Sequence, residues 1–224
     1  MDSTAWDERY ADSALVWSAT PNLFVEAELG GLPPGRALDL ATGEGRNAIW
    51  LAARGWRVTA VDFSAAGLDK ARTVHAAHAR SEQLDIDWVH ADVLEYDPDP
   101  GGYDLALLAY LQLSADQRRE SVRRAFDALA PVGTLFVVAH DSTNLTEGTG
   151  GPQDPSVLFT ADDILDDLAG YDFDVERAER VARTVVPDEP SHQPSHEPSH
   201  EPSHRHPGEP ARTAYDALVR LRRV

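Results

Sequence analysis

Short runs of aliphatic and β-branched residues alternate along the chain with longer stretches in which apolar residues recur every three or four positions. This alternation is typical of βαβ units around a mainly parallel sheet. The pattern predicts strands at 36–40, 57–61, 86–90, 103–108, 134–139, 173–182 and 212–221. It predicts helices at 47–54, 65–80, 115–130 and 161–168. The fold class is therefore α/β.

Local residues mark several helix ends. Ser64, Ser114 and Thr160 each precede a helical stretch and can cap it with a side-chain oxygen. Pro131 and Gly133 are expected to end the helix before the fifth strand.

Two segments lie outside the alternation. An aromatic-rich stretch at 6–17 and a helix at about 22–30 precede the first strand, and we expect residues 1–34 to form a helical cap that covers the edge of a site. Between the last two strands, residues 187–210 carry a four-unit Pro-Ser-His repeat. A proline in every fourth position prevents helix and ladder pairing, so this segment is expected to be an exposed or disordered loop.

The repeat also invites a metal-binding interpretation, because imidazole is a common metal ligand. Its histidines are His192, His196, His200 and His204, followed by His206. A polyproline-like chain has three residues per turn, so a four-residue spacing points successive imidazoles in different directions. We therefore favour a solvated loop that binds metal only adventitiously and expect no metal site.

Composition narrows the possible partners. The 224 residues carry a formal net charge of −18, which repels phosphate backbones and anionic lipid, so neither nucleic acid nor membrane is an expected partner. The longest apolar run, 105–111, is far shorter than the ~20 residues of a membrane-spanning helix. The acidic N-terminus lacks the features of a secretory signal, and the chain has no cysteine. We expect one cytoplasmic domain over 1–224, with the oligomeric state open.

The most informative stretch is Arg36-Ala37-Leu38-Asp39-Leu40-Ala41-Thr42-Gly43-Glu44-Gly45-Arg46-Asn47-Ala48, a predicted strand, turn and helix start. Its two glycines permit left-handed backbone and a close approach of a ligand. The helix start presents free amide groups. The stretch therefore predicts a ligand-binding turn.

Three acids accompany this turn. Asp39 lies near the end of the first strand, Asp62 ends the second and Asp92 follows the third. In an open parallel sheet these strand ends form one crevice, which is the expected ligand site.

Two cofactor classes compete for the crevice. The spacing of Gly43, Gly45 and Ala48, with Asp62 further on, matches the dinucleotide fingerprint formally. Asp39 argues against it, because a pyrophosphate gains nothing from a neighbouring carboxylate, whereas an ammonium group is stabilised by one. S-adenosylmethionine has such an ammonium group, ribose hydroxyls for Asp62 and an adenine amino group for Asp92.

The segment from Leu38 to Gly45 resembles the glycine motif of class I S-adenosylmethionine-dependent methyltransferases, with Ala41 where the first glycine usually stands. The triplet Gly45-Arg46-Asn47 and the leader Trp6-Asp7-Glu8-Arg9-Tyr10, with Trp17-Ser18 and Pro21-Asn22, are similar to tellurite-resistance and thiopurine-type small-molecule methyltransferases. The resemblance implies a Rossmann-like three-layer sandwich with a mostly parallel seven-stranded sheet and an antiparallel last strand. The implied cofactor-binding residues are Asp39, Ala41, Gly43, Gly45, Arg46, Asn47, Asp62, Phe63, Asp92, Val93 and Ala109.

Methyl transfer from a sulfonium is an in-line displacement, so the protein mainly positions a small-molecule acceptor and excludes water. His140 and Tyr110, after the fifth and fourth predicted strands, are the candidate catalytic residues, and 142–158 is a candidate lid. Two alternatives stay open. The domain could bind the cofactor without turnover as a sensor or interaction module, or, less expected, it could be an NAD(P)-dependent oxidoreductase.

Overall fold

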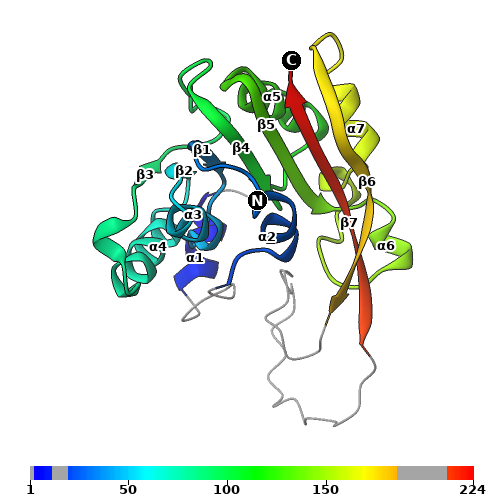
Figure 1. Ribbon diagram of the computed structural model, residues 1–224. Helices are drawn as coiled ribbons and strands as arrows, with labels where there is room; N and C mark the ends of the chain where they lie inside the picture. The colour runs from blue at the N-terminus through cyan, green and yellow to red at the C-terminus, as the bar shows by residue number, and fades with distance from the viewer. Residues whose placement is uncertain (1–2, 12–19, 186–210) are drawn as a thin grey trace, which may run out of the picture.

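A computed structural model of the chain describes residues 3–11, 20–185 and 211–224 (Figure 1). It contains one seven-stranded sheet in the order β3-β2-β1-β4-β5-β7-β6. The strands are β1 Arg36–Leu40, β2 Arg57–Asp62, β3 Ile86–His90, β4 Tyr103–Ala109, β5 Leu129–His140, β6 Phe173–Val185 and β7 Arg212–Arg223. All seven predicted strands are present, and β1 and β3 have the predicted bounds.

Strand direction confirms the predicted topology. The neighbouring strands from β3 to β5 pair in parallel, while β7 is antiparallel to both β5 and β6. The strand order reverses between β1 and β4, so the carboxyl ends of these two strands flank a topological switch point. A crevice at this point is where an open α/β sheet binds its ligand.

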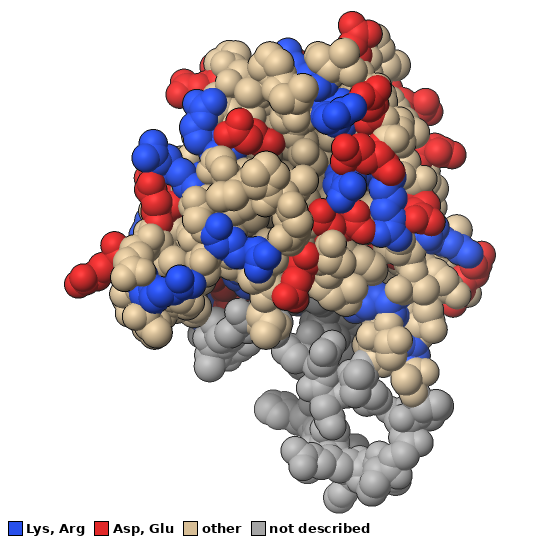
Figure 2. Space-filling view, in the orientation of Figure 1, with Lys and Arg blue, Asp and Glu red and all other residues tan. Residues whose placement is uncertain are grey.

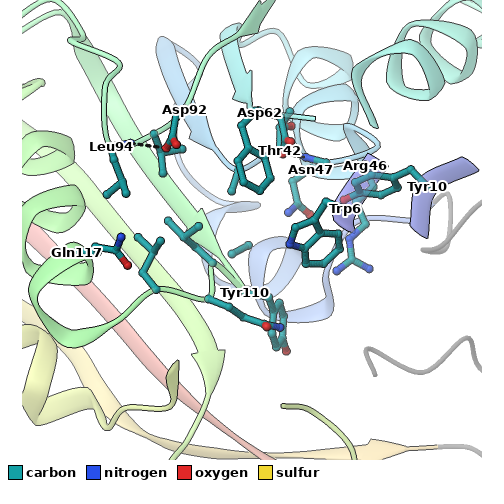
Figure 3. Close-up of a pocket in the computed structure, with 18 residues that line it drawn as sticks. Trp6, Tyr10, Thr42, Arg46, Asn47, Asp62, Asp92, Leu94, Tyr110 and Gln117 are labelled. Carbon is teal, nitrogen blue, oxygen red and sulfur yellow. Dashed lines mark hydrogen bonds between the residues drawn. The ribbon is translucent and has the colours of Figure 1, made fainter. Parts of the chain in front are cut away.

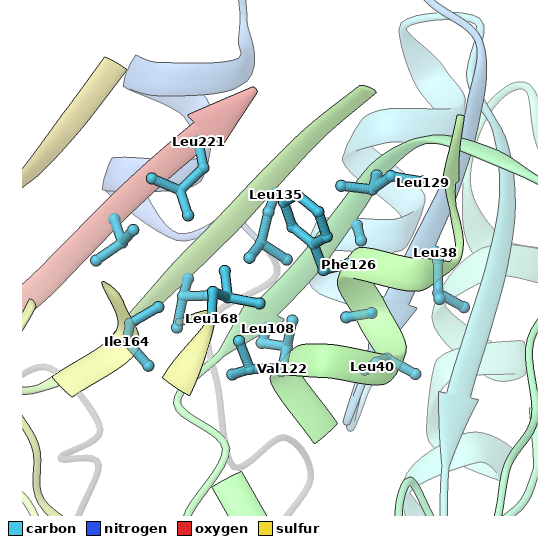
Figure 4. Close-up of a cluster of buried hydrophobic side chains, with 14 of the residues drawn as sticks. Leu38, Leu40, Leu108, Val122, Phe126, Leu129, Leu135, Ile164, Leu168 and Leu221 are labelled. Atoms are coloured by element: carbon cyan, nitrogen blue, oxygen red, sulfur yellow. The ribbon is translucent and has the colours of Figure 1, made fainter. Parts of the chain in front are cut away.

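Helices cover both faces of the sheet. α2 (Leu23–Leu29) and α3 (Arg46–Ala53) pack on one face, and α5 (Ala115–Asp127) and α7 (Ala161–Asp167) pack on the other. Figure 4 shows the core between the sheet and the helices α5 and α7. There Val122, Phe126, Ile164 and Leu168 pack against Leu135 and other strand residues. α1 (Ser3–Ala11) lies against α4 (Ala65–Ala77), which contacts β2 and β3. The fold is the expected three-layer sandwich.

The predicted caps are in place. The Ser64 hydroxyl accepts a hydrogen bond from the Gly67 amide at the start of α4, and Thr160 forms a capping box with Asp163 on α7. Ser114 forms a capping box with Gln117 on α5. Each cap satisfies amide groups that the first helical turn leaves without a partner.

The prediction that Pro131 and Gly133 end a helix was wrong. α5 ends at Asp127, and both residues lie within β5. Between the pairs Tyr103↔Leu129 and Leu105↔Thr134 the register shifts, so β5 has extra residues there. A proline lacks an amide hydrogen, and an irregular stretch is where a strand tolerates that loss.

Other boundaries differ less. The predicted helix at 65–80 stops at Ala77 and a short 3₁₀ turn, Ser81–Gln83, follows. The short helix α6 (Asn144–Glu147) and a second 3₁₀ turn, Pro155–Val157, follow β5. The Pro-Ser-His repeat and Trp17 lie outside the described residues. Within the described ranges, no helix combines the length and apolar character needed to cross a membrane.

Candidate active site

A cavity of about 380 Å³ lies at the carboxyl ends of β1, β2 and β4, beside the switch point (Figure 3). Its size falls in the usual range for small-molecule sites. Ten of the predicted site residues line it, namely Ala41, Gly43, Arg46, Asn47, Asp62, Phe63, Asp92, Val93, Ala109 and Tyr110. The other three, Asp39, Gly45 and His140, are not among its lining residues.

The turn between β1 and α3 has a left-handed backbone at alternate residues. Ala41, Gly43 and Gly45 have φ values of 60°, 58° and 76°. A side chain on Gly45 would clash with the indole ring of Trp88, so this glycine serves the packing of the turn. Ala41 adopts the same conformation with a Cβ atom, which costs about 1–2 kcal/mol.

Asp62 joins the turn to β2. Its Oδ2 accepts a hydrogen bond from the Gly43 amide at 2.7 Å, and its Oδ1 accepts one from the Ser64 amide at 2.8 Å. Burial raises the pKa of this carboxyl, and the two amide hydrogen bonds oppose that rise. An ionised carboxylate has about four acceptor positions, so Asp62 keeps capacity for a ligand in the cavity.

Asp39 lies behind the wall of the cavity. It is 1% exposed, and its Oδ2 accepts a hydrogen bond from the hydroxyl of Thr42, which does line the cavity. Burial raises the pKa of Asp39 to about 7, although the Thr42 hydrogen bond opposes the rise. The hydrogen bond from Thr42 therefore offsets only part of the cost of burying a negative charge on Asp39.

Asp92 follows β3 on another wall. Its Oδ1 accepts a hydrogen bond from the Leu94 amide at 2.9 Å, and both residues line the cavity (Figure 3). This Asx-type turn orients the carboxylate locally.

Two residues at the start of α3 face the cavity. Arg46 is partly buried, and burial lowers the pKa of its guanidinium. The Asn47 side chain accepts a hydrogen bond from the Asn22 amide at 2.9 Å, and Asn22 in turn caps α2. Asn47 therefore joins the start of α2 to the glycine turn, a link that the sequence did not reveal.

Tyr110 belongs to a buried polar cluster. Its backbone is left-handed with φ 59°, and its hydroxyl donates to Asp216 Oδ2 at 2.9 Å. Asp216 is fully buried; Arg183 donates to the same oxygen at 3.0 Å, and His140 Nδ1 lies 3.3 Å from the other. Burial would raise the pKa of Asp216, but the hydrogen bond from His140 and the charge of Arg183 lower it below its ordinary value.

Sequence reasoning missed Asp216 and Arg183. The available signal was Asp216 itself, a charged residue within an otherwise apolar strand segment that ends in Ala217-Leu218-Val219. Such a residue is buried only with partners.

The segment 142–158 contributes no lining residue to the cavity. Asn144 connects it to β7, because its side chain donates to the Gly150 carbonyl and accepts from the Tyr215 amide. Gly151 lies on His140, where an added Cβ would come within 2.9 Å of the ring. The leader residues Trp6 and Tyr10 line the cavity instead, across from Asp92 and Leu94 (Figure 3).

Comparison with known proteins relates part of the chain to methyltransferases. Residues 37–133 match the methyltransferase domain family. An uncharacterized methyltransferase of Mycobacterium bovis is 30% identical over 135 residues, which are 59% of this chain and 64% of the relative. A methyltransferase of Mycobacterium tuberculosis matches to the same extent. The match thus spans less than two thirds of the length of these relatives.

Solved structures share the whole fold. A structure from work on the conversion of a disulfide bond into a thioacetal group during echinomycin biosynthesis has a TM-score of 0.70 and 21% identity, and the match covers 99% of this chain and 92% of that one. TehB from Haemophilus influenzae has a TM-score of 0.67 and 16% identity over 99% of this chain and 67% of its own. Residues 37–133 are therefore similar to the methyltransferase domain family, and the chain shares its fold with solved structures of S-adenosylmethionine-dependent methyltransferases.

Proposed function

We propose that the chain binds S-adenosylmethionine and transfers its methyl group to a small-molecule acceptor. The observation that carries the proposal is the cavity at the switch point of a methyltransferase domain, lined by the glycine turn and by Asp62 and Asp92. A neighbouring structure, the 1,6-didemethyltoxoflavin-N1-methyltransferase of Burkholderia thailandensis, has S-adenosylhomocysteine bound, with a TM-score of 0.57, 18% identity, and 99% of this chain and 79% of that one covered.

The residues present suit this cofactor. Asp62 has acceptor capacity for the two ribose hydroxyls, and Asp92 for the adenine amino group. The uncompensated charge of Asp39 favours a ligand that brings an ammonium group to Thr42 and the glycine turn. A dinucleotide would bring a pyrophosphate to the same place, where that carboxylate would repel it. The donor set therefore favours S-adenosylmethionine over a nicotinamide cofactor.

The bound cofactor supplies a methyl group already activated on a sulfonium. The chain's own residues then hold the acceptor in line with that methyl group and keep water out. Trp6 and Tyr10 form one wall for this purpose, and Tyr110 and Leu111 from the end of β4 form another.

We propose that Tyr110 shapes the acceptor end of the cavity and that His140, which lies outside the lining, acts through the Tyr110 ring, whose centroid is 4.9 Å from its own. Tyr110 gives its hydroxyl hydrogen to Asp216, and burial together with the charge of Asp216 raises the pKa of this phenol far above neutrality. His140 is 3% exposed and lies beside the same carboxylate. A phenol that keeps its proton supports positioning rather than proton abstraction.

A small-molecule acceptor fits the surface charge. Figure 2 shows basic and acidic side chains interspersed on the visible face. Ion pairs such as Arg180–Glu147 and Arg222–Asp174 occur on the β6–β7 side. With a net charge of −18, this surface does not favour a polyanionic acceptor. We further propose a cytoplasmic location and a single domain over 1–224, with residues 1–34 as its cap and the repeat at 187–210 as a surface loop.

Titration calorimetry tests the cofactor assignment directly. Binding of S-adenosylmethionine and S-adenosylhomocysteine without binding of NADH is the expected result, and the reverse would refute it. A panel of small-molecule acceptors, scored by release of S-adenosylhomocysteine, then separates an enzyme from a cofactor-binding interaction protein. Binding without release on any acceptor would favour the latter.

A further inference from the structure

The leader helix α1 has few means of staying folded on its own. It has nine residues, and an isolated helix of that length is marginal in water. α1 packs against α4. Its position therefore depends on individual contacts with that helix.

Asp7 on α1 makes two polar contacts with the start of α4. Its Oδ1 accepts a hydrogen bond from the Ser64 hydroxyl at 2.5 Å and a second from the Ala66 amide at 3.2 Å. Both donors lie at the N-terminus of α4, where the helix dipole favours a negative charge. The Ser64 amide also donates to Asp62, so one buried serine contacts both carboxylates.

This contact sets the position of two aromatic side chains. Trp6 and Tyr10 flank Asp7 on α1, their ring centroids are 5.5 Å apart, and both line the cavity with Asp62 and Phe63. Tyr10 is 4% exposed and packs closely on Gly67, where a Cβ would lie 3.0 Å from its ring. Any ligand that contacts Asp62 inside the cavity is thus enclosed on one side by α1.

We propose that Asp7 is a positioning residue that latches α1, with Trp6 and Tyr10, over the bound cofactor and so sets how long the cofactor stays. The proposal rests on the proposed function, because it assumes that the cavity binds S-adenosylmethionine and its product. The latch joins α1 to the start of α4 through the Ser64 hydroxyl and the Ala66 amide. A short helix packed on the surface opens more readily than the core of a domain.

The matched variants are Asp7→Ala and Glu8→Ala. Both remove one carboxylate from the same helix, but Glu8 is exposed and Asp7 makes the contacts with α4. The probe is S-adenosylhomocysteine, with its dissociation constant from calorimetry and its dissociation rate from stopped-flow displacement by excess S-adenosylmethionine. For Asp7→Ala we expect the dissociation rate to rise about tenfold, the effect of losing a hydrogen bond to a charged group. For Glu8→Ala we expect the wild-type rate.

A second measurement needs no variant. Trypsin needs locally unfolded backbone to cut the bond after Arg9, so a ligand that keeps α1 folded against α4 should slow this cleavage, and we expect saturating S-adenosylhomocysteine to do so in the wild-type chain. Equal dissociation rates for the two variants, or cleavage that the ligand does not slow, would overturn the latch while the proposed function stood. A wild-type chain that binds neither S-adenosylmethionine nor S-adenosylhomocysteine would instead refute the proposed function, and the latch with it.

Discussion

The buried carboxyl of Asp39 makes the stability of this protein depend on pH in a predictable way. Burial raises its pKa in the folded protein to about 7, from 3.8 for an exposed aspartate. The folded-state pKa lies above the unfolded value, so the protonated carboxyl makes its full contribution to the free energy of unfolding below pH 3.8. That contribution is lost as the pH rises through about 7. We predict that Asp39→Asn removes this dependence.

The size of the effect follows from the two pKa values. The linkage relation gives a loss of about 2–3 kcal/mol in the free energy of unfolding of the wild type between pH 5 and pH 8 from this one group. The groups whose charges or hydrogen bonds act on Asp39 are Thr42, Asp62, Arg46 and the Ala48 amide. All of them remain in the variant, so the difference between the two proteins isolates Asp39.

Urea denaturation at pH 5 and pH 8 measures this difference. The wild type should lose about 2–3 kcal/mol more than Asp39→Asn over this interval. Asp87→Asn is the control, since Asp87 is exposed on β3 and should retain the wild-type pH dependence. If wild type and Asp39→Asn lose stability in parallel, the carboxyl is ionised at both pH values and the reasoning from burial is wrong.

Three further substitutions test the site. Asp62→Ala should weaken S-adenosylhomocysteine binding about 10- to 100-fold in calorimetry, because the ribose hydroxyls lose their acceptor; an unchanged dissociation constant in a folded variant would remove Asp62 from the site. Ala41→Gly should raise the free energy of unfolding by about 0.5–1 kcal/mol, since relief of the left-handed alanine exceeds the entropy cost of glycine, and a lower melting temperature would contradict this. Tyr110→Phe should cost about 1–3 kcal/mol by urea denaturation, because buried Asp216 loses a donor. The control Tyr171→Phe, which removes an exposed hydrogen bond, should cost less, and equal losses would argue against the cluster.

Much of the cavity could be predicted because its determinants are local in sequence. The strand β1, the turn with Gly43 and the start of α3 lie within a few residues of one another, and each has a sequence signal that does not depend on distant contacts. Asp62 and Asp92 follow from the same logic, since parallel strands bring their carboxyl ends together. The parallel strand order alone therefore predicts that these two acids lie at the same edge of the sheet.

The rest of the site depends on pairing across long stretches of chain. Asp216 reaches Tyr110 only because β7 pairs with β5 in the register His140↔Asp216, 76 residues apart in sequence numbering. Arg183 joins them from β6, whose partner is also β7. Periodicity predicts each strand but not its register. The same limit applies to 142–158: its glycines and prolines suggest a lid, but the sequence does not reveal the hydrogen bond from the Tyr215 amide to Asn144 that joins this segment to β7.

Three residues whose conformation or burial costs stability, Ala41, Tyr110 and Asp39, lie at or beside the cavity. Ala41 and Tyr110 are two of the three non-glycine residues with left-handed backbone among those described, they follow the adjacent strands β1 and β4, and both line the cavity. Asp39 lies behind Thr42, which lines the cavity, and burial disfavours the charged form of its carboxyl. Strain and uncompensated charge persist where surrounding structure over-determines them, as Asp216 does for Tyr110. A cation bound at Thr42, as we propose for the ammonium group of S-adenosylmethionine, would compensate the charge of Asp39 and leave the left-handed backbone of Ala41 and Tyr110 unchanged.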